Sequence, residues 1–417
     1  METSKSFLKE VLPAISMILD YQDNGNLYHA WRVSVLSFYL AELICPKKVS
    51  AVFYAALLHD IGAMGFREHV TDHPKKEEQK ELPWLKNHTT KGAEIISEIP
   101  GFNEISDLVL NHHEWWNGDG YPNGLEGDSI SIGSQIIRIA DSFDLFLRKA
   151  AKPNITEVYD YFRTHAGREY KKELWPAVLD LKNKNGGVFF HELLEDNKIQ
   201  LHFSNVLNIV PECKVTISSN FVEIVLRLFG RIVDTKHPYT SGHTERVAKY
   251  SEAVARKMGL KEKEIEKIRH AAYLHDLGKT TTPLAILDKP GKLNEEELYL
   301  MKRHPVVTME IIDSISSLRE LSPLAGYHHE KYDGTGYPDK LKADEIPIGA
   351  AIIGAADTID AMTSDRAYRK ALTLDAVISE LKLHSGTQFH PRVADAVIAL
   401  IEDVLKGEKG LPSFVAA

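Results

Sequence analysis

Cysteine is scarce in this sequence, which has only Cys45 and Cys213 among its 417 residues. Two thiols so far apart exclude a disulfide framework and a thiolate metal cluster, and they indicate the reducing cytosol. Long apolar runs are also missing, because no stretch reaches the ~18 residues that a membrane-spanning helix needs. The N-terminus lacks the basic and apolar regions of a secretory signal. We therefore expect a cytoplasmic protein without a membrane segment.

Positive charge is also in short supply. The chain has 50 Lys and Arg against 59 Asp and Glu, and its net charge is −9. Binding of polymeric nucleic acid needs clustered basic residues, so we expect no such partner. A small anionic ligand in a locally positive pocket is compatible with this balance. The content of 43% hydrophobic and 26% charged residues is typical of a globular protein, and the length predicts two or three domains.

Histidine is abundant, with 19 copies, and many of them belong to two series with the same spacing. In each series, successive members are separated by 29, 24 and 29 residues. The first series is His59, His88, His112 and Asp141, and the second is His275, His304, His328 and Asp357. One such pair could arise by chance, but matching intervals across a series indicate two copies of one unit.

Both copies have the apolar pattern of helices. Apolar residues recur at steps of three and four in residues 223–234, 252–259, 376–384 and 392–405. The best candidate for a strand is 198–205. These patterns predict an all-α fold, with a first domain at 1–185, a short connector at 186–220 and a second domain at 221–417.

The second copy collects side chains that suit a metal centre. They are His243, His275, Asp276, His304, His328, His329 and Asp357. Imidazoles and carboxylates without thiolates favour first-row metals such as iron, manganese, cobalt or zinc. Seven ligands are too many for one tetrahedral zinc, but they suit two metals that share a carboxylate. Asp276 is the best bridge, because its two oxygens offer several lone-pair directions. A lone buried histidine is more often a core residue, but five histidines and two aspartates in register, in both copies, favour metal.

At this point the motifs resemble a known family. His275 and Asp276 with Lys279, then His328-His329-Glu330 and the DGTGYP segment at 333–338, are similar to the HD-GYP phosphodiesterases of the HD metal-dependent phosphohydrolase superfamily. The resemblance covers about 221–405, and it extends to the first copy over about 20–181. It implies two tandem helical bundles, of which the second hydrolyses a cyclic dinucleotide, chiefly cyclic di-GMP, to a linear dinucleotide and on to GMP.

The resemblance also implies a ligand set. One metal would be held by His243, His275, Asp276 and Asp357, and a second by His304, His328 and His329 with Asp276 bridging. Family members with a third metal have a glutamate where this chain has Tyr239, or Gly25 in the first copy. We therefore expect two transition-metal ions in the second copy, with iron and manganese as the metals that the family uses.

The first copy departs from the family in its cations. Its candidate ligands are all present, namely His29, His59, Asp60, His88, His112, His113 and Asp141. Ala63, however, stands where Lys279 is expected, and the SDRAYRK segment at 364–370 is replaced by LFLRKAA at 145–151. We expect a degenerate copy that binds up to two metals and has little or no activity. The alternative is that these histidines serve only as structure.

Several other residues have expected roles. Asp276 and Lys279 would be catalytic, and Lys279 would also hold a phosphate oxygen. Arg366 and Lys370 would hold the other phosphate. Tyr337 would stack on a base or pack within its loop, and Glu330 would accept an imidazole N–H or face solvent.

Two alternative functions stay open at this point. One is hydrolysis of 3′,3′-cyclic GMP-AMP, and the other is a cyclic-dinucleotide sensor without catalysis. The protein partners that the resemblance leaves open are a second copy of the chain and a diguanylate-cyclase-type protein.

Overall fold

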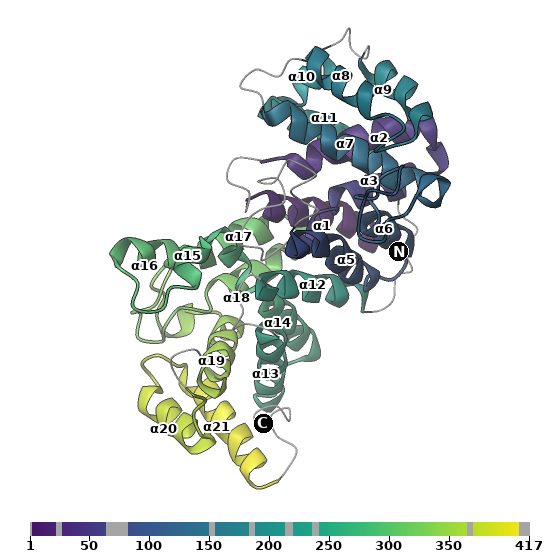
Figure 1. The fold of residues 1–417 in the computed structure, drawn as a ribbon. Helices are drawn as coiled ribbons and strands as arrows, with labels where there is room; N and C mark the ends of the chain where they lie inside the picture. The colour runs from purple at the N-terminus through teal and green to yellow at the C-terminus, as the bar shows by residue number, and fades with distance from the viewer. Residues whose placement is uncertain are drawn as a thin grey trace. The chain divides into compact units, whose positions relative to one another are not determined.

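The computed structural model describes residues 2–21, 27–63, 82–149, 155–182, 188–212, 220–235, 242–364 and 370–407. Four residues that the sequence singles out lie outside these ranges, namely Gly25, Cys213, Tyr239 and Arg366. The chain divides into two compact units, Met1–Phe221 and Val222–Ala417. Figure 1 shows helices throughout both units. No strand occurs in the described ranges, so the predicted all-α fold is confirmed.

The first unit is a bundle of mostly short helices. They are α1 (Glu2–Tyr21), α2 (His29–Ile44), α3 (Val49–Leu57), α5 (Pro83–Ser97), α6 (Asn103–Leu110), α7 (Ile132–Lys149), α8 (Ile155–His165), α9 (Trp175–Lys182), α10 (Phe189–Glu192) and α11 (Asp196–Ile209). Helix α2 is central, and it packs against α3, α7 and α11. The short 3-10 helix η2 (Ile61–Ala63) packs against α5.

The second unit repeats this arrangement. Its helices are α12 (Phe221–Thr235), α13 (His243–Lys257), α14 (Glu262–Leu274), α15 (Leu284–Leu287), α16 (Glu295–Lys302), α17 (His304–Asp313), α18 (Ser322–Gly326), α19 (Ile348–Thr363), α20 (Leu374–His384) and α21 (Pro391–Leu405). Helix α13 packs against α14 and α19, as α2 does against α3 and α7. The 3-10 helix η8 (Leu277–Thr281) packs against α17.

The segment expected to be a connector is part of the first unit over residues 188–212. Phe203 of α11 stacks on Trp31 of α2, with ring centroids 4.1 Å apart. Phe190 packs against Phe143 of α7 at 4.4 Å. This segment has no counterpart in the repeat, yet its aromatic side chains cover the apolar surface of the first unit.

The strand predicted at 198–205 is wrong, because these residues lie within α11. The buried residues of this helix are Ile199, Phe203 and Val206, at steps of four and three. Leu201, which completed the apparent alternation, is 57% exposed. The true period was therefore helical, and the exposed leucine imitated a strand.

None of the helices in the described part of the chain combines the length and the apolar character that crossing a membrane requires.

Candidate metal centre

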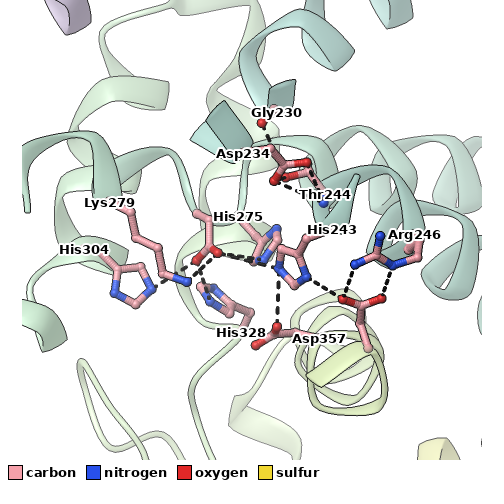
Figure 2. Close-up of polar contacts among 12 residues, drawn as sticks. Gly230, Asp234, His243, Thr244, Arg246, His275, Lys279, His304, His328 and Asp357 are labelled. Carbon is pink, nitrogen blue, oxygen red and sulfur yellow. Dashed lines mark hydrogen bonds and ion pairs between the residues drawn. The ribbon is translucent and has the colours of Figure 1, made fainter. Parts of the chain in front are cut away.

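The candidate ligands of the second unit converge from elements that are distant in sequence. His243 begins α13, and His275 and Asp276 follow α14. His304 begins α17, where Pro305 is suited to the first turn. His328 and His329 follow α18, and Asp357 lies on α19. Figure 2 shows the labelled histidines around one centre, with Lys279 at its side.

Asp276 lies between two groups of histidines. Its Oδ2 is 3.4 Å from Nε2 of His275 and 3.7 Å from Nε2 of His243. Its Oδ1 is 3.4 Å from Nε2 of His304 and 3.9 Å from Nε2 of His328. Each carboxylate oxygen therefore faces a different group, which is the arrangement of a bridging ligand.

The remaining candidates join these two groups. His329 lies with Asp276, His304 and His328 in one cluster of ligand atoms that are all within 4.8 Å of one another. Asp357 faces the other group, with Oδ1 3.5 Å from Nε2 of His243. All seven residues proposed from the sequence are thus brought to one site.

Backbone carbonyls fix the orientation of three imidazoles. Nδ1 of His275 donates to Ala272 O at 2.8 Å, and Nδ1 of His304 donates to Met301 O at 2.8 Å. His328 donates in the same way to Ala325 O at 2.6 Å. Because Nδ1 carries the proton, the lone pair of each Nε2 is directed into the site.

These inward atoms fit metal ions. Nε2 of His275, His304 and His328 and Oδ1 of Asp276 are buried without a hydrogen-bond partner among the described residues. Leaving buried acceptors unpaired costs free energy. A cation at each group would satisfy them, and nitrogen and oxygen donors of this kind suit first-row transition metals.

Two residues that sequence reasoning missed hold His243 in place. Nδ1 of His243 donates to Oδ2 of Asp360 at 2.8 Å, and Nε of Arg246 donates to Oδ1 of the same carboxylate at 2.5 Å. Asp360 is buried. Such a carboxylate fixes the tautomer of a metal-binding histidine. The signal was present in the sequence, because Arg246 and Asp360 each follow a candidate ligand by three residues. The first copy has Arg32 and Asp144 at the same spacing.

The electrostatics of the site separate the two groups. Burial and the nearby charge of Lys279 lower the pKa of His304 to about 3. Burial and the neighbouring His275 lower the pKa of His328 to about 4. Burial opposes the charge on His243 as well, but hydrogen bonds to Asp276 and Asp360 raise its pKa to about 10. The imidazoles of His304 and His328 are therefore neutral near pH 7, whereas that of His243 favours its protonated form.

Lys279 contacts the bridging carboxylate directly. Its Nζ lies 2.5 Å from Oδ2 of Asp276. Burial would raise the pKa of Asp276, but Lys279 and His275 hold it well below its usual value. The side chain of Lys279 is 27% exposed, so it reaches both the carboxylate and the solvent side of the site.

The DGTGYP loop supports His329. Tyr337 stacks on His329, with ring centroids 4.8 Å apart and planes at 26°. Glu330 is buried, and its Oε1 accepts the backbone N–H of Asp339 at 2.7 Å. Glu330 thus braces the loop instead of accepting from an imidazole or facing solvent. A Cβ on Gly336 would lie 2.3 Å from Lys331 N, so this position needs glycine for close backbone approach.

Two of the predicted phosphate-binding residues, Arg366 and Lys370, stay predictions. Arg366 lies outside the described residues, and Lys370 is exposed at the start of the next described segment. The structure instead adds Lys302, an exposed residue at the end of α16 whose Nζ is 5.3 Å from the ring centroid of Tyr337. It precedes His304 by two residues, which was the only signal in the sequence.

The first unit reproduces much of this geometry. Oδ2 of Asp60 is 3.3 Å from Nε2 of His59 and 3.7 Å from Nε2 of His29, and Oδ1 is 3.5 Å from Nε2 of His88. Two ligand clusters are again formed, one by His29, His59 and Asp141 and one by Asp60, His88, His112 and His113. The His29 ring donates to Asp144, as His243 does to Asp360.

The first unit has alanine at the position of Lys279. Ala63, which takes that position, is buried at the end of η2. No cationic side chain therefore contacts Asp60 from this position.

Comparison with known proteins gives three matches that agree with this geometry. The HD domain family matches residues 16–174 and 227–393. The sequence is 32% identical over 308 residues to the 3'3'-cGAMP-specific phosphodiesterase 3 of Vibrio cholerae. This alignment covers 74% of this chain and 65% of that protein. It is 39% identical over 175 residues to the cyclic di-GMP phosphodiesterase response regulator RpfG of Xanthomonas campestris, which covers 42% of this chain and 46% of that protein. The chain thus spans less than two thirds of each relative.

A solved structure shares the fold. The crystal structure of a cyclic GMP-AMP specific phosphodiesterase of Vibrio cholerae, V-cGAP3, matches with a TM-score of 0.64 and 24% identity, over 95% of this chain and 98% of that one.

Proposed function

Since the chain belongs to the HD domain family, which matches both of its units, we propose that it is a metal-dependent phosphodiesterase of cyclic dinucleotides whose second unit is catalytic. The kinship with HD-GYP phosphodiesterases that the motifs predict is confirmed by the relatives. The observation that carries the proposal is the position of Asp276, which turns one oxygen toward each of two groups of buried histidines.

In this proposal the second unit holds two transition-metal ions. His243, His275 and Asp357 hold one with Asp276, and His304, His328 and His329 hold the other with the same carboxylate. The donor set of imidazoles and carboxylates favours iron or manganese over a thiolate-binding metal. When bound, such a pair activates water and stabilises the attacking and leaving oxygens of a phosphodiester.

The protein's own cations would bind the substrate. Lys279 is placed to move from the Asp276 carboxylate to a phosphate oxygen, where a charge-assisted hydrogen bond stabilises developing negative charge. Lys302 offers a second positive charge next to Tyr337. We assign Arg366 and Lys370 to the other phosphate. We assign two roles to Tyr337: it positions His329, and it lies on the side of the site where a base would bind.

Cyclic di-GMP is the substrate that the family resemblance implies, and 3′,3′-cyclic GMP-AMP is the second candidate. The relative with cyclic GMP-AMP specificity aligns over 308 residues, which is longer than either unit, while RpfG aligns over 175. The shared two-unit architecture therefore favours the second candidate. The sensor hypothesis is weaker, because Lys279 already contacts the bridging carboxylate.

The remaining parts of the proposal concern location and partners. A cytosolic location is supported by the cysteine content and by free Cys45. A second copy of the chain and a diguanylate-cyclase-type protein stay as proposed partners.

The test is turnover of cyclic di-GMP and 3′,3′-cyclic GMP-AMP by the full chain, together with its metal content. Replacement of the bridge in Asp276→Asn should abolish hydrolysis and release metal, because both metal positions lose a ligand. Retention of full activity by this variant would rule out the assigned site. A wild-type protein that binds both nucleotides without hydrolysing either would establish the sensor instead.

A further inference from the structure

A buried arginine distinguishes the site of the first unit from that of the second. Arg138 lies on α7 and is 1% exposed. Its Nη1 is 2.8 Å from Nδ1 of His113 and 3.2 Å from Oδ2 of Asp141. In the second copy, the aligned segment 347–360 has Gly354 at this position. The arginine therefore contacts two candidate metal ligands of the first unit. The equivalent ligands of the second unit have glycine in place of this arginine.

The hydrogen bond to His113 determines the state of that ring. A guanidinium has five N–H donors and no acceptor, so Nδ1 of His113 must be the acceptor. A neutral imidazole with its lone pair at Nδ1 carries its proton at Nε2. Nε2 of His113 is buried without a partner among the described residues, and in this tautomer it has no lone pair for a metal.

A second difference accompanies the arginine. Nε of Arg138 lies 3.7 Å from Oε2 of Glu169, and both side chains are buried. The HAGREY segment at 165–170 aligns with HSGTQF at 384–389, so Glu169 corresponds to Gln388. A buried positive charge needs a nearby negative one. The first unit has the pair and the second unit has neither charge, which indicates that the two positions work together.

The same place in the second unit is a cavity. It has a volume of about 90 Å³, and His329, Tyr337, Gly354, Thr358, Gln388 and His390 are among the residues that line it. Gly354 has no side chain, so nothing reaches His329 from this position of α19. His329 therefore keeps its freedom to present a lone pair to the metal, whereas His113 does not.

We propose that Arg138 serves as a built-in cation that disables the second metal position of the first unit, which then binds one metal ion where the second unit binds two. Asp60, His88 and His112 still face that position, but the fourth ligand is lost and a positive charge lies beside it. The other position keeps its ligands, since Nε2 of His29 and Nε2 of His59 face each other at 3.2 Å.

The inference narrows the expectation of up to two metals in the first copy to one, and it gives a reason for degeneracy beyond the missing lysine. A site with one metal lacks the pair that clamps both oxygens of a phosphodiester. The prediction concerns binding rather than turnover, so it can fail while the proposed phosphodiesterase activity stands.

Metal content of the full chain tests this proposal. The protein and its variants would be equilibrated with Mn²⁺ at a free concentration that saturates the second unit of the wild-type protein. Bound metal would then be counted by mass spectrometry. The matched pair is His88→Ala and His304→Ala, which truncate equivalent histidines. We expect His304→Ala to lose about one equivalent and His88→Ala to lose none.

Two further variants complete the test. Arg138→Gly combined with Glu169→Gln introduces into the first unit the residues that the second unit has at these positions. This double variant should bind one more equivalent of metal than the wild type, and adding His88→Ala should remove that equivalent. His29→Ala should lose one equivalent from the otherwise wild-type chain. The proposal is overturned if His88→Ala alone lowers the metal content, or if His29→Ala leaves it unchanged. These single variants decide the matter even if the Arg138 variant does not fold.

Discussion

At the scale of single residues, the site depends on neutral histidines that are buried beside a charged carboxylate. His304 and His328 have pKa values lowered to about 3 and about 4, first of all by burial. Their Nδ1 protons are held by backbone carbonyls. Both rings are therefore ready to bind a metal without first losing a proton, at the expense of stability in acid.

The first prediction concerns acid sensitivity of the metal-free protein. An unfolded histidine binds a proton below ~6.5, whereas folded His304 stays neutral until about pH 3. The unfolded chain therefore binds more protons between these values, and stability present above pH 6.5 is lost as the pH falls. From pH 6.5 to 4.5, His304 alone should lower the free energy of unfolding by about 2 to 3 kcal/mol.

Chemical denaturation in a chelator, at both pH values, checks this expectation. His304→Gln should lose less stability than the wild type across the range. His384→Gln, whose side chain is 44% exposed, should behave like the wild type. His243 does not blur the comparison, because its raised pKa of about 10 leaves it protonated in both states below pH 6.5. Equal losses in His304→Gln and wild type would contradict the assignment.

At the scale of elements, the crossing of η8 and α17 sets the distance between Asp276 and His304. A Cβ on Gly278 would lie 2.0 Å from His304 O and 2.8 Å from Thr308 N. Its backbone N–H also donates to Oγ1 of Thr308 at 2.8 Å. Glycine at position 278 therefore permits this close backbone contact. Gly62 in the first unit approaches His88 O in the same way.

We therefore predict that Gly278→Ala moves the start of α17 away from Asp276. Overpacking of this kind costs about 1 to 3 kcal/mol, and displacement of a ligand should reduce turnover at least roughly tenfold. Gly62→Ala is the matched control, with a similar loss of thermal stability and little loss of turnover. If both variants keep wild-type kinetics, the crossing does not set the geometry of the site.

At the scale of the whole molecule, the two units of the repeat differ in the side chains around their ligand clusters. Both keep a bridging aspartate and its histidines. The second unit adds Lys279 at 2.5 Å from that aspartate, whereas the first has Ala63 in place of the lysine and Arg138 against His113. Each unit has its own helical core, so we expect them to tolerate damage at the two sites separately.

The expected division of labour is testable with one pair of variants. Asp60→Asn should leave most turnover of cyclic di-GMP or cyclic GMP-AMP intact, because the first copy has Ala63 at the position of Lys279 and lacks the SDRAYRK sequence. We propose that the cations of the second copy at these positions bind substrate, each contact being worth about 1.5–3 kcal/mol. It should lower the melting temperature through loss of a bound metal. Asp276→Asn, assayed beside it, should be inactive. An inactive Asp60→Asn, or an equal fall in both, would mean that the first unit is catalytic or obligatory.

The sequence by itself determined the composition of the sites and the helical class. Ligand side chains are chemically specific, and their repeated spacing survives in the primary structure, so the seven candidates of each copy could be named without coordinates. Tertiary structure decided how those side chains are used. His243 is oriented by Asp360, which lies 117 residues away, and His113 is occupied by Arg138. Ring orientation and burial arise only when distant helices pack, since hydrogen-bond partners and exposure are properties of the folded neighbourhood rather than of the local sequence.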